Sequence, residues 1–173
     1  RSWTRRCGRG LPLPFNRVPD HEHRPLYRHH PHDRTSMSTP TSVVFVCKKN
    51  GGKSQLAAAL LRALGDESVS VASAGTVPGG SLNAESVESL AELGIDVGDE
   101  RPKPLTPAML DGADLVVVLG NEAQLPDGVT VPVERWITDE PSERGITGME
   151  RMRLVRDDIR ARVAELHERI RDA

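Results

Sequence analysis

The sequence of 173 residues contains few aromatic residues and only two cysteines, Cys7 and Cys47. Two cysteines so placed make no disulfide framework, so each must be judged by its reactivity. No run of about 18 apolar residues occurs, which excludes a membrane-spanning helix, and the start lacks the apolar stretch of a secretory signal. We therefore expect a cytoplasmic protein that binds neither a membrane nor a metal.

The charge is divided unevenly along the chain. Residues 1–36 contain eight arginines against three acidic residues, a net charge of +5, and residues 37–173 contain 15 basic and 22 acidic residues, a net charge of −7. Residues 1–40 lack apolar periodicity, so we expect disorder there. A basic nucleic-acid arm or a histidine-rich metal tract is the functional alternative. Because Met37 stands just before the first predicted strand, we favour a non-native or upstream-translated extension, followed by one domain at residues 41–173.

Predicted strands and helices alternate throughout this domain. The strands are predicted at residues 43–46, 69–72, 115–119 and 129–133, and the helices at 54–64, 83–93, 106–110 and 148–171. The alternation indicates an α/β, three-layer fold with a central four-stranded parallel sheet. Ligands of such folds bind outside the carboxyl ends of the strands, where Cys47 follows the first strand. The last helix alternates arginines with acids, which does not indicate nucleic-acid binding.

A glycine-containing loop joins the first strand to the first helix and carries the candidate chemistry. Backbone N–H groups in such a loop form an anion-binding nest, and the helix N-terminus adds partial positive charge. This field favours the thiolate form of Cys47, the candidate nucleophile, at neutral pH. Lys53 adds a full charge, Ser54 is placed to donate to the sulfur, and Asn50 to lock the loop. The candidate oxyanion-binding residues are Lys48, Lys49, Asn50, Gly51, Gly52, Lys53 and Ser54.

Two other interpretations of the loop are weaker. The phosphate loop of nucleotide hydrolases, G-x-x-x-x-G-K-S/T, matches from Gly52 to Ser54 but has Cys47 in place of its first glycine. The strand at 115–119 is also followed by no immediate acidic residue for magnesium. A buried structural cysteine is the second alternative, but Cys47 stands at a strand end, before six polar or glycine residues.

A family resemblance narrows the interpretation. Four stretches, with gaps between them, together span almost all of residues 43–166: VVFVCKKNGGKSQLAAAL, SAGTVPGGSLNAESVESLAELGIDV, ADLVVVLG and WITDEPSERGITGMERMRLVRDDIRARV. In these stretches the domain resembles the low-molecular-weight tyrosine phosphatase-like superfamily, whose signature is C-x5-R-S/T. It is most similar to the actinobacterial single-cysteine arsenate reductases, the arsenate–mycothiol transferases. Lys53 stands where the signature has arginine, and lysine cannot bind an oxyanion through two parallel hydrogen bonds as arginine does. The mycothiol-linked branch also has lysine at this position, so the resemblance favours that branch over the phosphatases.

The resemblance also implies a general acid and a co-substrate. The superfamily carries an Asp-Pro whose acid protonates the leaving oxygen; here Asp139 is the first choice and Glu140, directly before a proline, the second. Residues 48–173 contain no cysteine, so an external thiol must resolve any arsenic bound to Cys47. The resemblance implies mycothiol as co-substrate, with a mycoredoxin downstream and no bound cofactor. Ser73, Thr76, Lys103 and Arg151 are weaker candidates to face the site.

The expected activity is therefore arsenate reduction by transfer of arsenate to the external thiol. A low-molecular-weight protein tyrosine phosphatase is the enzymatic alternative, although the domain has only Phe45 and Trp136 to grip a phenyl ring. A thiol-based redox or arsenic sensor is the non-enzymatic alternative, but no DNA-binding helix pair accompanies the domain.

Overall fold

The computed structural model describes residues 40–173, and the interpretation of residues 1–39 as a disordered extension lies outside the described part of the chain. The order of strands and helices confirms the predicted alternation. The elements are β1 (Thr41–Cys47), α1 (Lys53–Arg62), β2 (Val69–Gly75), α2 (Ala84–Ala91), α3 (Pro107–Asp111), β3 (Leu115–Leu119), β4 (Val133–Trp136), the 3₁₀ helix η1 (Pro141–Arg144) and α4 (Gly148–Arg171). Within residues 40–173 no helix combines the length and apolar character needed to cross a membrane.

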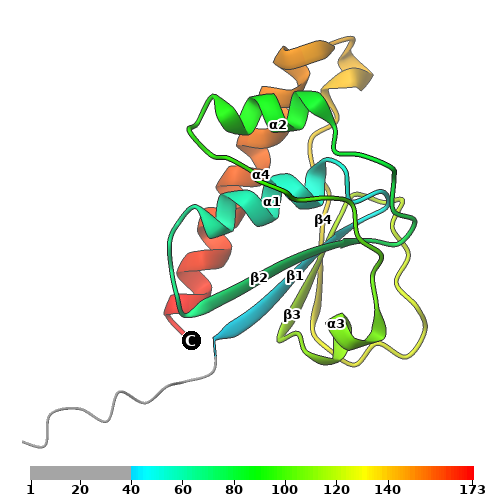
Figure 1. The fold of residues 1–173 in the computed structure, drawn as a ribbon, viewed down its shortest axis with the longest axis vertical. Helices are drawn as coiled ribbons and strands as arrows, with labels where there is room; N and C mark the ends of the chain where they lie inside the picture. Colours follow the sequence, from blue (N-terminus) through cyan, green and yellow to red (C-terminus); the bar gives the residue numbers. More distant parts are fainter. Residues whose placement is uncertain (1–39) are drawn as a thin grey trace, which may run out of the picture. The chain divides into compact units, whose positions relative to one another are not determined.

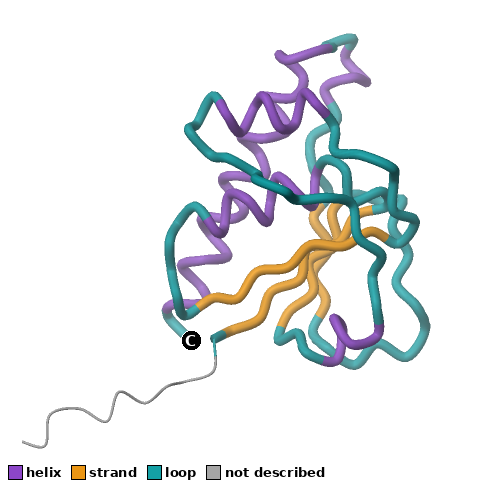
Figure 2. Tube along the Cα trace, in the orientation of Figure 1, coloured by secondary structure: helices purple, strands orange, loops and turns teal. Residues whose placement is uncertain are grey.

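The four strands form one parallel sheet, as predicted, and their order in it is β2-β1-β3-β4. The chain leaves β1 toward one neighbour, β2, and later returns on the other side as β3, so the order reverses between β1 and β3 (Figures 1 and 2). In open parallel sheets this reversal opens a crevice at the carboxyl ends of the strands. Cys47, the last residue of β1, lies at this crevice.

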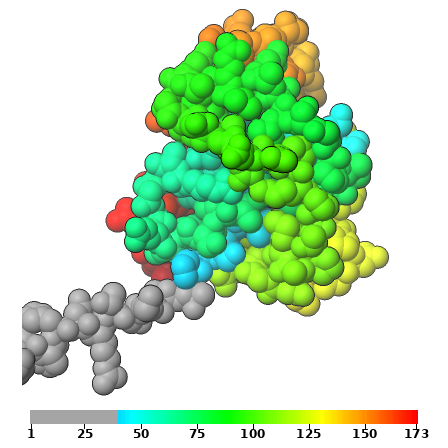
Figure 3. All heavy atoms as spheres, viewed as in Figure 1, coloured from blue at the N-terminus to red at the C-terminus, as the bar shows by residue number. Residues whose placement is uncertain are grey.

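Both faces of the sheet are covered, which is why β1 and β3 consist almost entirely of apolar residues. Val43 and Phe45 pack in one buried cluster with α1 and α4, and Val44 and Val46 pack in a second cluster with Leu110 of α3. Figure 1 shows α1, α2 and α4 on one side of the sheet and α3 on the other. In the space-filling view, the segment carrying α2 and the residues after it covers much of one face (Figure 3). The predicted three-layer arrangement is confirmed.

The position of the fourth strand was predicted wrongly. The predicted strand covered residues 129–133, whereas β4 begins only at Val133. Val129 and Val131 still pack against the α3 side of the sheet, but as loop residues. Pro132 has no N–H to donate to a strand ladder, and its carbonyl accepts the backbone N–H of Val116 at 2.9 Å. The apolar alternation that suggested a strand therefore belongs to the connection that leads into it.

Ion pairs join α4 to α2. Glu92 at the end of α2 accepts hydrogen bonds from Arg153 and from the buried Arg156. Arg151, one turn earlier on α4, pairs with Glu85 at 2.9 Å. These contacts fix the first turns of α4 beside the loop that follows Cys47.

A further ion pair joins α4 to the turn before β2. His167 lies 2.7 Å from Asp66. The hydroxyl and the N–H of Ser68, together with His167, lower the pKa of Asp66 to about 2.

Candidate active site

The ends of three strands meet around the sulfur of Cys47. A pocket of about 500 Å³ is lined by Cys47 and the following loop, by Leu119–Glu122 after β3, and by Glu140 after β4. Cys47 is 8% exposed, so its sulfur is sheltered while still lining the pocket. The sequence had predicted the β1 part of this pocket, whereas the contribution of Leu119–Glu122 required the sheet order.

The carbonyls of the loop after β1 are bonded to the segment after β2. In each trans peptide the N–H points in the direction opposite to the C=O. Because these carbonyls point toward the segment after β2, the N–H groups that follow them in the loop point the other way. The N–H of Asn50 shows the result, because it donates to the Cys47 sulfur at 3.2 Å. Such a row of inward N–H groups forms an anion nest. The bonds between the two segments each run from a backbone N–H after β2 to a carbonyl of the loop: Thr76 to Cys47 (3.1 Å), Val77 to Lys48 (2.8 Å), Gly79 to Lys49 (2.9 Å) and Asn83 to Gly51 (2.7 Å).

A buried side-chain network positions Ser54 beside Cys47. The Oδ1 atom of Asn50 accepts the amide of Gln55 at 3.2 Å and the backbone N–H of Lys103 at 2.8 Å. The other end of Asn50 is therefore its NH₂ group, which donates to Ser54 Oγ at 2.9 Å. The Ser54 O–H remains available to donate to Cys47 Sγ, 3.0 Å away, when the sulfur is a thiolate. Two donors thus converge on the sulfur, an arrangement that stabilises a thiolate.

The shape of the loop depends on two close backbone approaches. Asn50 has φ of +50°, a left-handed conformation that asparagine adopts more readily than most residues. Gly75, at the end of β2, passes so near that an added Cβ would lie 2.9 Å from both Lys48 O and Asn50 N. A side chain at position 75 would displace the loop, which makes this glycine part of the site.

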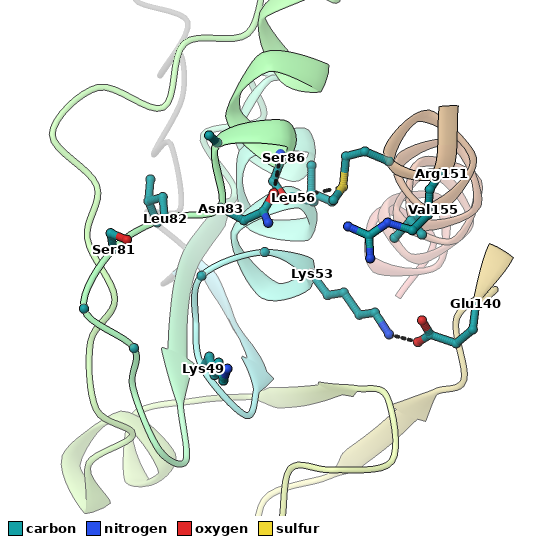
Figure 4. Close-up of a pocket in the computed structure, with 16 residues that line it drawn as sticks. Lys49, Lys53, Leu56, Ser81, Leu82, Asn83, Ser86, Glu140, Arg151 and Val155 are labelled. Carbon is teal, nitrogen blue, oxygen red and sulfur yellow. Dashed lines mark hydrogen bonds and ion pairs between the residues drawn. The ribbon is translucent and has the colours of Figure 1, made fainter. Parts of the chain in front are cut away.

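Lys53, the cation predicted beside the anion, reaches Glu140 in an ion pair (Figure 4). Their side chains are 26% and 42% exposed, so the pair stands at the boundary between pocket and solvent. Lys53 lies in the first turn of α1, where the helix N-terminus also favours a bound anion. An incoming oxyanion would therefore compete with Glu140 for Lys53.

The two candidate acids face in different directions. Asp139 makes a two-pronged ion pair with Arg144 at 2.7 and 2.8 Å, and the hydrogen bonds from Arg144 lower the pKa of Asp139. Glu140 instead lines the Cys47 pocket. This geometry favours Glu140, the second choice from the sequence, over Asp139 as a proton donor, because Asp139 is held ionised toward Arg144.

Several residues were missed or undervalued by the sequence reasoning. Gln55 is 3% exposed and orients Asn50; its only signal was a polar residue among the alanines and leucines of α1. Lys103 was expected to act through its side chain, which pairs with Glu100, but it is the backbone N–H of Lys103 that supports the loop. Glu122 pairs with Lys48 at 3.3 Å on the pocket rim.

The few aromatic residues of the domain do not line the candidate site. Phe45 and Trp136 are both buried and pack against each other in a tilted arrangement, with ring centroids 5.8 Å apart. Among the described residues, no aromatic side chain lines the Cys47 pocket.

Comparison with known proteins agrees with this geometry. The profile for the low molecular weight phosphotyrosine protein phosphatases matches residues 42–126. A putative arsenate reductase of Halobacterium salinarum is 32% identical over 138 residues, which cover 77% of this chain and 95% of the relative. A solved arsenate reductase in a phosphate-binding state superposes with a TM-score of 0.66 and 29% identity, covering 75% of this chain and 98% of that one.

A second solved structure, a thioredoxin-dependent arsenate reductase of Corynebacterium glutamicum, has a TM-score of 0.63 and 29% identity. The alignment covers 78% of this chain but only 64% of that longer chain.

The parallel sheet and the loop after β1 define an α/β protein in which a cysteine sulfur at a strand end contacts the Ser54 hydroxyl and the Asn50 N–H. Within that class, the sequence matches identify one family. The chain belongs to the low molecular weight phosphotyrosine protein phosphatase family, in the part of it that includes arsenate reductases.

Proposed function

We propose that this protein reduces arsenate by transferring it to an external low-molecular-weight thiol. The observation that carries the proposal is the one cysteine of residues 40–173, whose sulfur contacts the Ser54 hydroxyl and the Asn50 N–H inside an anion nest. Lys53 supplies the charge next to that nest. The relatives named arsenate reductases support arsenate as the oxyanion, and the phosphate-binding state of one of them supports tetrahedral-anion capture.

The first step forms a bond between sulfur and arsenic. Arsenate binds in the nest and draws Lys53 away from Glu140. The Cys47 thiolate attacks arsenic, an S–As bond forms and one As–O bond breaks. Glu140, released from Lys53, accepts a proton from one hydroxyl of the bound dihydrogen arsenate and passes it to the departing oxygen, which leaves as water. Lys53 and the loop N–H groups stabilise the negative oxygens that remain. Arsenic stays in the As(V) state throughout this step.

The second step returns the enzyme to its starting state. The external thiol attacks arsenic, gives its proton to Glu140 and displaces the Cys47 thiolate, leaving a thiol–arsenate adduct. Glu140 then releases this proton to solvent as Lys53 returns to pair with it. A second thiol then attacks the sulfur of this adduct and forms a disulfide, and arsenic departs with the electron pair as As(III). Because residues 48–173 contain no cysteine, neither thiol comes from the domain after Cys47. We assign them to mycothiol and a mycoredoxin, following the family resemblance.

A protein tyrosine phosphatase is the second candidate, because the family profile and the nest fit phosphate equally well. The lack of aromatic side chains in the described Cys47 pocket argues against a phenyl phosphate as substrate. The two functions are separated by assaying p-nitrophenyl phosphate without thiol alongside arsenate with mycothiol and mycoredoxin. Arsenate-dependent, thiol-dependent turnover supports the proposal, and fast phosphate hydrolysis without thiol would favour the phosphatase.

A further inference from the structure

A second pocket, of about 660 Å³, adjoins the pocket of Cys47. Lys49, Lys53 and Glu140 line both pockets, so the Lys53–Glu140 ion pair stands where the two meet. Figure 4 shows this pocket between the start of α4, the first turn of α1 and the segment at residues 79–83. The sequence reasoning did not predict it, because its walls come from segments far apart in the chain.

The lining combines an apolar floor with polar walls. Leu56, Met152 and Val155 supply apolar surface, and Arg151 enters from α4 while remaining paired with Glu85. The opposite wall is formed by residues 79–83, where two glycines leave room. A concave site of several hundred Å³ with an apolar floor and a few polar groups suits a small organic molecule.

The chemistry of Cys47 indicates what that molecule is. Under the proposed function, an external sulfur must reach arsenic on Cys47. The second pocket is placed for this, because it shares Lys49, Lys53 and Glu140 with the pocket of Cys47. A reductant protein would cover the rim rather than fill a pocket of this kind. We propose that the 660 Å³ pocket binds the polar body of a low-molecular-weight thiol, with its sulfur directed past Lys53 toward Cys47. This inference rests on the proposed function.

The ion pair between the two pockets also sets an order of binding. While Lys53 is paired with Glu140, the pair separates the thiol pocket from the sulfur of Cys47. A bound oxyanion takes Lys53 into the nest and frees the passage. The thiol therefore binds productively after arsenate, so thiol affinity rises when a tetrahedral anion is present.

The test uses a substitution that fills the pocket without straining the backbone. A Cβ added at Gly80 meets no atom within 4 Å, and the backbone there is not left-handed, so Gly80→Trp is compatible with the fold. Ala164→Trp, on an exposed position of α4 away from both pockets, is the matched control. We expect Gly80→Trp to raise the KM for mycothiol about tenfold or more, with the KM for arsenate within about twofold of wild type. Arg151→Gln should raise the thiol KM in the same direction.

A second measurement does not depend on turnover. Calorimetry with S-methyl mycothiol, in the presence and absence of phosphate, reports binding to the pocket alone. Binding that strengthens with phosphate, and is lost in Gly80→Trp but kept in Ala164→Trp, supports the inference even if no arsenate reduction is found. The inference is wrong if the folded Gly80→Trp protein retains wild-type thiol binding and thiol KM, or if reduced thioredoxin supports turnover that mycothiol does not. Absence of arsenate turnover with every reductant would instead overturn the proposed function.

Discussion

Removing the hydroxyl of Ser54 should make Cys47 a much slower nucleophile. The hydroxyl lies 3.0 Å from the buried sulfur, is held there by the bond from Asn50, and donates to the thiolate, which has no proton of its own to donate. A hydrogen bond to a charged group contributes about 1.5–3 kcal/mol, and each 1.4 kcal/mol is tenfold in an equilibrium. In Ser54→Ala the thiolate fraction at pH values where the thiol dominates should therefore fall about 10- to 100-fold.

The rate of iodoacetamide alkylation measures that fraction, because only the thiolate reacts. Rates for wild type and Ser54→Ala are compared between pH 5 and 7, with alkylation of Cys47 read by mass spectrometry of its peptide. Ser70→Ala, at an exposed position of β2, is the control and should react like wild type. A folded Ser54→Ala protein alkylated at the wild-type rate would show that Ser54 does not hold the sulfur as the geometry indicates.

Three further predictions concern the loop and the fold. Gly75→Ala should reduce activity at least tenfold, measured as arsenate turnover with mycothiol, because its Cβ would meet loop backbone at 2.9 Å. Ile159→Ala should lower the free energy of unfolding in urea by about 2–5 kcal/mol, since Ile159 is fully buried, whereas Leu154→Ala, 39% exposed, should change it by less than about 1 kcal/mol. Asp66, with its pKa lowered to about 2, stabilises the fold above its ordinary pKa of 3.8 and loses that contribution as the pH falls toward 2. Over that pH window, the free energy of unfolding measured in urea should fall less steeply for Asp66→Asn than for wild type. The same pH dependence in both proteins would contradict this prediction.

Much of the site was predictable because its central part is local in sequence. A buried strand, Cys47, a run of polar and glycine residues and an alanine-rich helix follow one another directly, and their spacing alone indicates a nest at a strand end. The alternation of apolar segments likewise predicts a parallel sheet. Asn50 and Ser54 lie within a few residues of the sulfur that they support.

What could not be predicted depends on contacts between distant segments. Glu140 meets Lys53 across 87 positions of sequence, and only the folded chain shows that its neighbour Asp139 turns to Arg144 instead. The fourth strand was misplaced because apolar alternation at residues 129–133 does not distinguish a strand from a loop that packs against the core. The role of Gly75 was hidden for the same reason, since the loop that it accommodates belongs to another element.

Protection of Cys47 by arsenate tests the central claim most directly. Alkylation of Cys47 by iodoacetamide at pH 6.5 is measured over increasing arsenate, with chloride at matched ionic strength as the control. If a tetrahedral oxyanion binds in the nest beside the thiolate, the rate falls along a saturating curve that reaches near-complete protection, and Lys53→Met weakens the protection. An alkylation rate that stays constant at every arsenate concentration would contradict the account.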